Sequence, residues 1–414
     1  MAGVLACLAI FALEVLVESL LESEEERGRS PLAHSIFELS GVYQRAVTVG
    51  WRKPEPRFTV IVELNVDNDP RLRAVSVNAV CDQRAFLAEL IGRLTAAGPA
   101  VIVLDKYFGR DICERHPAGT EALRRAVANA RAAGIPVVVG LNAVQGPGGE
   151  HPGGGIRIEP SLFGETSSVV DQAIVNIDHD SRRMALRWCG AVDADGVTRP
   201  DWCETLALKT ARTYDRQIVV KYPRLQTLLE QGSHPYISFM RPEQFCRYAV
   251  LADGSLAKRS DRRCPVNPDG TVSVEYIRGR VVVFGETSRY IDIHTSAVGP
   301  VSGVFMHANY VEALLDDRYF KAVPALDYLF GIATFLAVTL IGAKLHGRPG
   351  LAIVLITLTV TCVIGLVVGL ILLGGLYVNP VGVSVLALLF DGSHIALSWV
   401  LGKTARHAAA RGAG

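Results

Sequence analysis

Near its end the chain reads ALDYLFGIATFLAVTLIGA, KLHGRPG, LAIVLITLTVTCVIGLVVGLILL, GGLYVNP and VGVSVLALLFDGSHIALSWVL without interruption, over residues 325–401. A helix needs about 20 mostly apolar residues to cross the roughly 30 Å of hydrocarbon in a bilayer. The middle segment has no polar stripe, which a core helix of a water-soluble protein would carry. We therefore predict three transmembrane helices, at residues 325–343, 351–373 and 378–401. The alternative is three helices buried in a large soluble core.

The flanking charges predict how this block is oriented. Basic residues stand between the first and second segments and after the third, namely Lys344, His346, Arg348, Lys403, Arg406 and Arg411. By the positive-inside rule, the first connector and the short tail at residues 402–414 face the cytoplasm. The domain formed by residues 22–324 is then expected on the extracytoplasmic side of a bacterial plasma membrane.

An apolar opening segment at residues 3–21 provides the additional crossing that this topology requires. Glu14 and Glu18 share one helical face, and each costs about 2.5–3.5 kcal/mol at the bilayer centre, although Glu18 can reach the interface. A cleaved signal peptide fits less well, because the segment has no basic lead and no A-x-A cleavage site. We expect residues 1–21 to form an N-terminal transmembrane anchor.

Composition limits the class of protein. The chain has 414 residues and a formal net charge of +1. A nucleic-acid-binding protein would need a concentrated basic surface, so no nucleic-acid partner is expected. About 300 residues remain outside the membrane block, enough to form one large domain or two smaller ones.

Eight cysteines are present. Cys7 and Cys362 stand in apolar segments and are interpreted as small core residues. The other six would meet an oxidising environment outside the cytoplasm, where disulfides form. Pairing neighbours along the chain gives the disulfides Cys81–Cys113, Cys189–Cys203 and Cys246–Cys264. Other pairings stay open, as do six reduced thiols in a cytosolic protein; a zinc site is disfavoured because no C-x-x-C pair occurs.

Apolar runs alternate with helical periodicity through the large domain. Buried strands are expected at residues 58–65, 100–105, 136–141 and 279–286. Helices are expected at residues 84–94, from Thr120 to Gly134, at 202–214 and at 304–314. A hairpin is expected at 173–178 and 183–188, extended pieces at 218–221 and 236–239, and a surface excursion at 253–270. Strands and helices that alternate with short connections predict an α/β fold with a mainly parallel sheet covered by helices.

Several of these stretches together resemble the type 2 CHASE domain, an extracytoplasmic sensory module of bacterial cyclases and kinases. The similar stretches are VIVELN, AVIVLDKYF, VNIDHDSRRMALRW, GRVVVFGETSRYIDIHTS and GVFMHANYVEALLDDRYF, and the resemblance covers roughly residues 50–400. That family places two or three transmembrane helices directly after the domain, as expected here. Its members commonly carry a kinase or cyclase after the last helix, where this sequence has only residues 402–414. The resemblance therefore implies a sensor without an output domain of its own.

Polar residues follow the expected strands, and ligands of a parallel sheet meet the carboxyl ends of its strands. The ligand-binding residues expected there are Asn65, Asp67, Asp105, Asn142, Glu286, Asp292 and His294. For Asp105 the alternative is a loop cap that accepts backbone N–H groups. Asp292, His294 and His307 match no metal-ligand spacing, so neither a metal nor a cofactor is expected.

Ionisable residues inside a membrane segment are functional candidates. Asp391 and His394, with Ser393 between them, lie in the third predicted transmembrane helix. They would serve either a proton or signal relay or an interhelical hydrogen bond.

The sequence thus predicts a multi-pass membrane sensor that takes a small-molecule ligand and signals to a separate cytoplasmic or membrane partner. The lipid bilayer is an expected partner, and a homo-oligomer is left open. An anchored extracytoplasmic enzyme and a structural scaffold are the alternatives. No catalytic role is assigned to any residue, because none of the motifs G-x-S-x-G, H-E-x-x-H or Walker A occurs.

Overall fold

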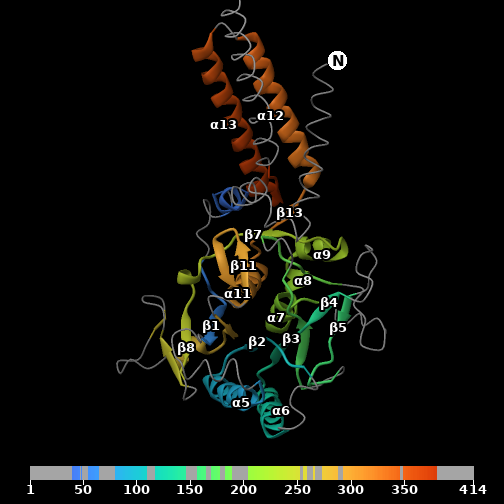
Figure 1. Cartoon of the computed structure of the whole chain (residues 1–414), viewed down its shortest axis with the longest axis vertical. Helices are drawn as coiled ribbons and strands as arrows, with labels where there is room; N and C mark the ends of the chain where they lie inside the picture. The colour runs from blue at the N-terminus through green and yellow to red at the C-terminus, as the bar shows by residue number, and fades with distance from the viewer. Residues whose placement is uncertain are drawn as a thin grey trace, which may run out of the picture. The chain divides into compact units, whose positions relative to one another are not determined.

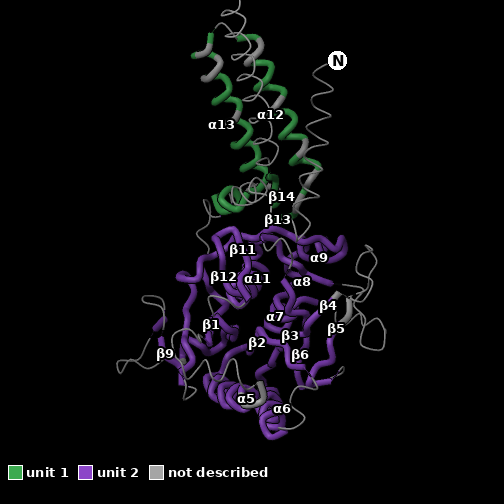
Figure 2. Tube along the Cα trace, in the orientation of Figure 1, with its two compact units in different colours: residues 1–47, 320–414 green, residues 48–319 purple. Residues whose placement is uncertain are grey.

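The structure is a computed structural model, and it describes fourteen stretches of the chain. They are residues 40–46, 48, 55–64, 80–109, 117–145, 156–164, 169–177, 182–188, 204–251, 255–258, 264–265, 273–287, 292–345 and 348–379. Contacts divide the chain into two units (Figure 2), one of residues 48–319 and the other of residues 1–47 with 320–414.

The larger unit is built on a seven-stranded sheet with the order β6-β3-β2-β10-β1-β8-β9. Its strands are β1 Thr59–Leu64, β2 Val101–Tyr107, β3 Val137–Leu141, β6 Asp171–Ile174, β8 Arg247–Val250, β9 Leu256–Lys258 and β10 Val281–Glu286. Every neighbouring pair is parallel except β8 and β9, which pair antiparallel. The predicted mainly parallel α/β sheet is confirmed.

Helices cover both faces of this sheet, as Figure 1 shows. Val60 and Val62 of β1 pack in one core with α5 (Val80–Ala97) and α6 (Pro117–Ala132). Ile61, between them, packs in the second core with α7 (Leu206–Tyr214) and α11 (Gly303–Leu315). Both faces of the strands are therefore apolar, which is why they read as continuous hydrophobic runs.

Shorter elements complete the larger unit. The helices are α8 Ile218–Lys221, α9 Pro223–Glu230, α10 Val274–Ile277 and the 3₁₀ turn Pro242–Gln244. The strands are β4 Ala143–Gln145, β5 Ile156–Ile158, β7 Tyr236–Ile237, β11 Ile293–Ser296 and β12 Gly299–Ser302. β4 with β5, and β11 with β12, form antiparallel hairpins.

Three local predictions were wrong. The expected hairpin of residues 173–178 and 183–188 does not form, because β6 pairs with β3 and Met184 N–H donates to the carbonyl of Pro235. Residues 218–221 are the helix α8 rather than an extended piece. Residues 256–258, expected in a surface excursion, form β9 on the sheet edge.

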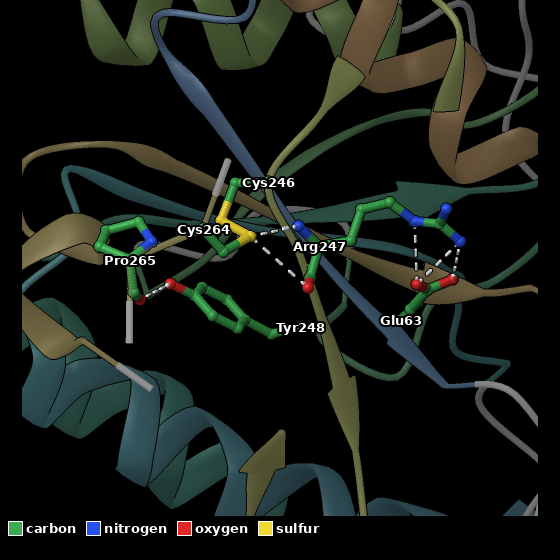
Figure 3. Close-up of a disulfide and its surroundings, with 6 residues drawn as sticks. All are labelled: Glu63, Cys246, Arg247, Tyr248, Cys264 and Pro265. Carbon is green, nitrogen blue, oxygen red and sulfur yellow. Dashed lines mark hydrogen bonds and ion pairs between the residues drawn. A yellow bond between two sulfur atoms is a disulfide. The ribbon is translucent and has the colours of Figure 1, made fainter. Parts of the chain in front are cut away.

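Cys246 and Cys264 form a disulfide (Figure 3). It ties the loop beyond β9 back to the start of β8, and both cysteines are buried in the core with α5 and α6. This is the expected pair. The side chain of Cys81, and all of Cys113, Cys189 and Cys203, lie outside the described residues, so the other two pairings stay predictions.

The smaller unit contains two long helices, α12 (Pro324–Lys344) and α13 (Pro349–Gly374). Among the described residues, only α13 holds an apolar window long enough to cross a membrane, Val354–Ile371, while α12 has a shorter apolar run, Ala325–Ile341. β13 (Tyr319–Ala322) pairs with β14 (Leu376–Tyr377). Cys362, expected in a core, is exposed on α13.

Parts of the membrane prediction fall beyond what the structure describes. Residues 378 and 379, the expected start of the third helix, are not helical, and the rest of that helix lies outside the described residues. The same holds for the anchor at residues 1–21 and for Asp391 and His394.

Candidate functional site

A cavity of about 390 Å³ lies at the carboxyl ends of the parallel strands in the larger unit. It is bounded by the ends of β1, β2, β3 and β10, by β11 and by α11, and it is lined by Leu64, Asp105, Lys106, Tyr107, Asn142, Val175, Asn176, Ile177, Phe284, Gly285, Glu286, Asp292, His294 and His307. This is the edge at which parallel α/β sheets bind ligands.

The structure brings together most of the expected ligand-binding residues. Asp105, Asn142, Glu286, Asp292 and His294 all line the cavity. Asn65 and Asp67 lie outside the described residues. That these side chains bind a ligand stays a prediction, but their common location follows from the topology that the strand pattern implies.

An irregularity in β2 directs Asp105 and Lys106 to the cavity. The pairing of β2 with β3 shifts register between Leu104 and Tyr107, and such a bulge redirects the side chains of the strand. Gly285 makes room on the neighbouring strand, because a Cβ there would lie 2.7 Å from Cβ of Val304 and 3.2 Å from Cβ of Asp105. β10, α11 and Asp105 can pack this closely only around a glycine.

Asp105 is the most buried acid of the cavity, with 5% of its side chain exposed. His307 Nε2 lies 3.4 Å from its Oδ1. Burial raises the pKa of Asp105 well above its ordinary value; the charge of Asp292 raises it further, and Lys106 opposes both. No described residue donates a hydrogen bond to this carboxyl, so the loop cap considered as an alternative is not seen in the described part of the chain.

His307 projects from α11 next to Asp105. Its Nε2 lies 3.0 Å from the carbonyl oxygen of Val175, and because a carbonyl only accepts, Nε2 carries the proton. Burial lowers the pKa of His307 to about 4, which the charge of Asp292 only partly opposes. The ring is therefore neutral at pH 7, and its Nδ1 is an acceptor that no described group fills.

Asp292 and His294 form a pair at the mouth of the cavity, with Asp292 Oδ1 2.7 Å from His294 Nε2. Burial alone would raise the pKa of Asp292, but the hydrogen bond and charge of His294, the charge of His307 and the N–H of Gly303 together lower it. Asp292 has φ of 55°, so its backbone is in the left-handed region.

Asp292 also holds the first turn of α11. Ser302 stands at the N-cap of this helix but makes no side-chain cap hydrogen bond. Instead the Gly303 N–H donates to the carbonyl of Asp292 at 2.9 Å. A Cβ on Gly303 would lie 2.0 Å from Asp292 Oδ2, so only glycine fits beside this carboxylate. Asp292 thus connects the mouth of the cavity directly to the first turn of α11.

Lys106 and Glu286 face each other across the cavity, with Nζ 3.9 Å from Oε2. Burial lowers the pKa of Lys106, while the charges of Glu286 and Asp105 raise it. Lys106 was not among the expected site residues, although it directly follows Asp105 in the quoted stretch AVIVLDKYF. The bulge that brings both side chains to one cavity has no signal in the strand pattern.

Asn142, after β3, and Asn176, after β6, also line the cavity. Asn142 Nδ2 donates to Glu159 Oε2 at 2.8 Å. Asn176 accepts from the N–H of Ala143 at 2.8 Å and donates to its carbonyl at 2.9 Å, which imitates a strand partner. Asn176 is therefore a structural bridge to β4. Each of these two amides thus uses one of its two N–H donors within the protein.

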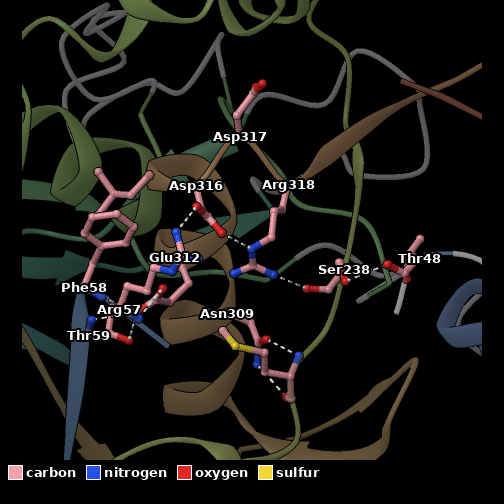
Figure 4. A network of polar contacts seen from close by, with 12 residues as sticks. Thr48, Arg57, Phe58, Thr59, Ser238, Asn309, Glu312, Asp316, Asp317 and Arg318 are labelled. Atoms are coloured by element: carbon pink, nitrogen blue, oxygen red, sulfur yellow. Dashed lines mark hydrogen bonds and ion pairs between the residues drawn. The ribbon is translucent and has the colours of Figure 1, made fainter. Parts of the chain in front are cut away.

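The far end of α11 is held by a second polar network (Figure 4). Glu312 is fully buried, and its carboxylate accepts the N–H groups of Arg57, Phe58 and Thr59 at the start of β1. Asn309 bonds both backbone groups of Met240. α11 is thus fixed to the sheet at its C-terminal half and to the cavity at its N-terminal half.

A metal site is not supported at this location. Among the described residues, no group of three or more His, Cys, Asp or Glu side chains could hold a metal ion. The Asp292, His294 and His307 set considered from the sequence therefore does not converge as ligands would.

One comparison with known proteins found a match. A family model described as CHASE2 domain matches residues 20–343. No curated protein and no solved structure matches the chain.

Proposed function

The chain belongs to the CHASE2 domain family, a family of extracytoplasmic sensory domains, and from this premise we propose that it is a membrane-anchored sensor. In this proposal the larger unit lies outside the cytoplasm and binds a small ligand in the cavity at the strand ends. Binding changes the helices of the smaller unit, and a separate cytoplasmic or membrane partner reads that change. The bilayer holds the chain, as a monomer or as a homo-oligomer.

The helices of the smaller unit support the membrane part of the proposal. Large apolar side chains on α12 and α13 are exposed, including those of Leu329, Leu340, Val354 and Leu358. Exposed apolar surface of this extent is stable in lipid and not in water. Lys344 and Arg348 in the connector favour a cytoplasmic location for it.

Cysteine labelling tests the orientation. Val220→Cys places a thiol at a position that is 82% exposed in the larger unit, and Lys344→Cys places one at the exposed end of α12. On intact spheroplasts, we expect a membrane-impermeant maleimide to label Val220→Cys and to label Lys344→Cys only after permeabilisation. The parent chain serves as the background. If only Lys344→Cys is labelled on intact spheroplasts, the proposed orientation is wrong and the larger unit lies on the cytoplasmic side.

The single observation that carries the sensor proposal is the position of α11. Its first turn is held by Asp292, its second turn brings His307 to the cavity, and its last turns hold β1 through Glu312. A few residues after α11 the chain continues into β13 and α12. Packed helices move as rigid bodies, so a ligand that displaces Asp292 would shift the whole of α11 and the chain that follows it.

Gly303→Ala tests this coupling without a ligand. The added Cβ would displace the Asp292 carboxylate, since the two would be 2.0 Å apart. In hydrogen–deuterium exchange of the full chain in detergent, we expect faster exchange in the first turn of α11 and altered exchange at residues 319–327. Gly92→Ala is the matched control, because its Cβ would meet nothing within 4 Å. Faster exchange confined to α11 would contradict the transmission of a change from α11 to residues 319–327. The remaining candidate functions would then be a binding protein, an enzyme or a scaffold.

A further inference from the structure

Asp105 is a buried carboxyl group that lines the cavity without a hydrogen-bond donor among the described residues. The nearest polar contact, His307 Nε2 at 3.4 Å, directs its proton to the carbonyl of Val175 instead. Buried polar groups in folded proteins nearly always have a partner, because an unfilled one costs about 1–3 kcal/mol. A buried acceptor that faces a cavity therefore points to a donor supplied by the ligand.

Several other polar groups of the cavity also offer acceptors. One N–H of the Asn142 amide and one of the Asn176 amide are used within the protein. His307 Nδ1 is an unfilled acceptor, and Glu286 and Asp292 add carboxylates. Lys106 is the one lysine or arginine among the lining residues, and it faces Glu286. The complement of these acceptors is a group that donates several hydrogen bonds.

Charge and apolar surface narrow the class further. Asp292 and Glu286 outnumber Lys106, so the cavity favours a cation even before Asp105 is counted. Leu64, Val175, Ile177 and Phe284 form an apolar wall in the same cavity. An alkylammonium group carries three N–H donors and one positive charge, and a short apolar body would fit this wall.

Resting on the sensor function proposed above, we propose that the cavity recognises a small primary amine, whose ammonium group hydrogen-bonds to the carboxyl of Asp105 while its apolar body packs against Phe284. The ligand is defined by this chemistry: a cationic N–H donor attached to a compact hydrocarbon.

The proposal makes binding depend on pH in one direction. Protons compete with the ammonium group for the Asp105 carboxylate, and the pKa of Asp105 is raised in the free protein, chiefly by burial. Affinity should therefore fall as the pH decreases from about 8 to about 5, where an alkylammonium stays charged as lysine does. The other titratable groups that line the cavity with Asp105 are Lys106 and Tyr107 on β2, Glu286 on β10, Asp292 just before β11, His294 on β11 and His307 on α11.

Three probes of similar size separate the chemical classes: 2-phenylethylamine, 2-phenylethanol and 3-phenylpropanoate. Binding to the full chain in detergent is measured by calorimetry, with exchange at residues 319–327 as a second readout. We expect the amine to bind about ten- to hundredfold more tightly than either other probe, and Asp105→Asn to remove this preference together with the pH dependence. Glu121→Gln, which changes an exposed carboxylate on α6, should leave the affinity unaltered.

Each other outcome overturns a specific part. If the alcohol or the carboxylate binds as tightly as the amine, if none of the three binds, or if Asp105→Asn binds the amine normally, the ligand class is wrong. Should a probe other than the amine alter exchange at residues 319–327, the sensor function stands without this ligand class. Amine binding that leaves that exchange unaltered would support the ligand class and contradict the sensor function.

Discussion

Replacing Glu312 with alanine is expected to lower the free energy of unfolding of the larger unit by about 3–5 kcal/mol. The Glu312 carboxylate accepts N–H groups from Arg57, Phe58 and Thr59 at 2.7–3.1 Å and the hydroxyl of Thr59 at 2.8 Å. Alanine would leave these donors at the start of β1 unpaired, and each unpaired buried donor costs about 1–3 kcal/mol. Pulse proteolysis of the full chain in detergent measures the loss.

Glu312→Gln is the matched control, because glutamine keeps one acceptor oxygen in nearly the same place. Oε1 alone takes the N–H groups of Phe58 and Thr59 and the Thr59 hydroxyl. Glutamine should therefore cost clearly less than alanine, and the amides of residues 58 and 59 should stay protected from exchange. Equal losses in the two variants would mean that the packing of the side chain, and not its hydrogen bonds, holds β1 to α11.

The sheet could be predicted because its strands report their environment directly. Apart from Glu63 and Glu286, VIVEL and VVVFGE are apolar on both faces, as expected for strands of a sheet covered on two sides. Helix periodicity likewise identified α5, whose Leu87, Leu90, Ile91 and Leu94 are all fully buried. The carboxyl ends of these strands then predicted where polar residues would gather.

Local propensity failed where a tertiary contact decided the conformation. Residues 218–221 read IVVK, a β-branched run that favours a strand. In the structure Ile218 is buried while Val220 is 82% exposed, and the Lys221 N–H closes a helical turn on Gln217. The run lies between two helices, α7 and α9, and pairs with no strand in the described part of the chain.

The polar partners of buried charges were beyond prediction. Glu312 is an acidic residue on a helix, where sequence alone favours an exposed face, and its partners lie about 250 positions earlier. Asp105 could be predicted as a candidate because it follows a buried strand in the sequence. The bulge in β2 that brings Lys106 to the cavity, and the packing of α11 that brings His307 there, depend on tertiary contacts. The sequence predicted where candidate residues gather, and the structure shows which groups line the same cavity.

Arg247 and Glu63 form an ion pair between β8 and β1 in the larger unit (Figure 3). Glu63 on β1 is 0% exposed, and Arg247 on β8 donates to both its oxygens, Nε to Oε1 at 3.0 Å and Nη2 to Oε2 at 3.1 Å. The guanidinium also stacks 5.0 Å from the ring of Phe305 on α11. The disulfide holds the main chain of Arg247, whose N–H lies 2.9 Å from Cys264 Sγ.

Arg247→Met is expected to lower the free energy of unfolding by about 3–5 kcal/mol, because it leaves the buried Glu63 carboxylate without the guanidinium that donates to both its oxygens. Methionine keeps most of the volume, so a cavity does not explain the loss. The double variant Glu63→Met with Arg247→Met should recover most of the stability, since an apolar pair of similar volume removes the buried carboxylate as well. Pulse proteolysis of the four chains of this double-mutant cycle supplies the coupling energy.

An exposed ion pair provides the comparison that decides the cause. The side chains of Glu121 and Arg124 form an ion pair and are 51% and 45% exposed. Glu121→Ala, which removes this pair, should lower the free energy of unfolding by no more than about 0.5 kcal/mol. If Arg247→Met costs no more than this, water reaches Glu63 and the pair is a surface pair. If the double variant is as unstable as the single one, the stacking on Phe305 is the main contribution, and Arg247 stabilises β8 against α11 by packing instead of by charge.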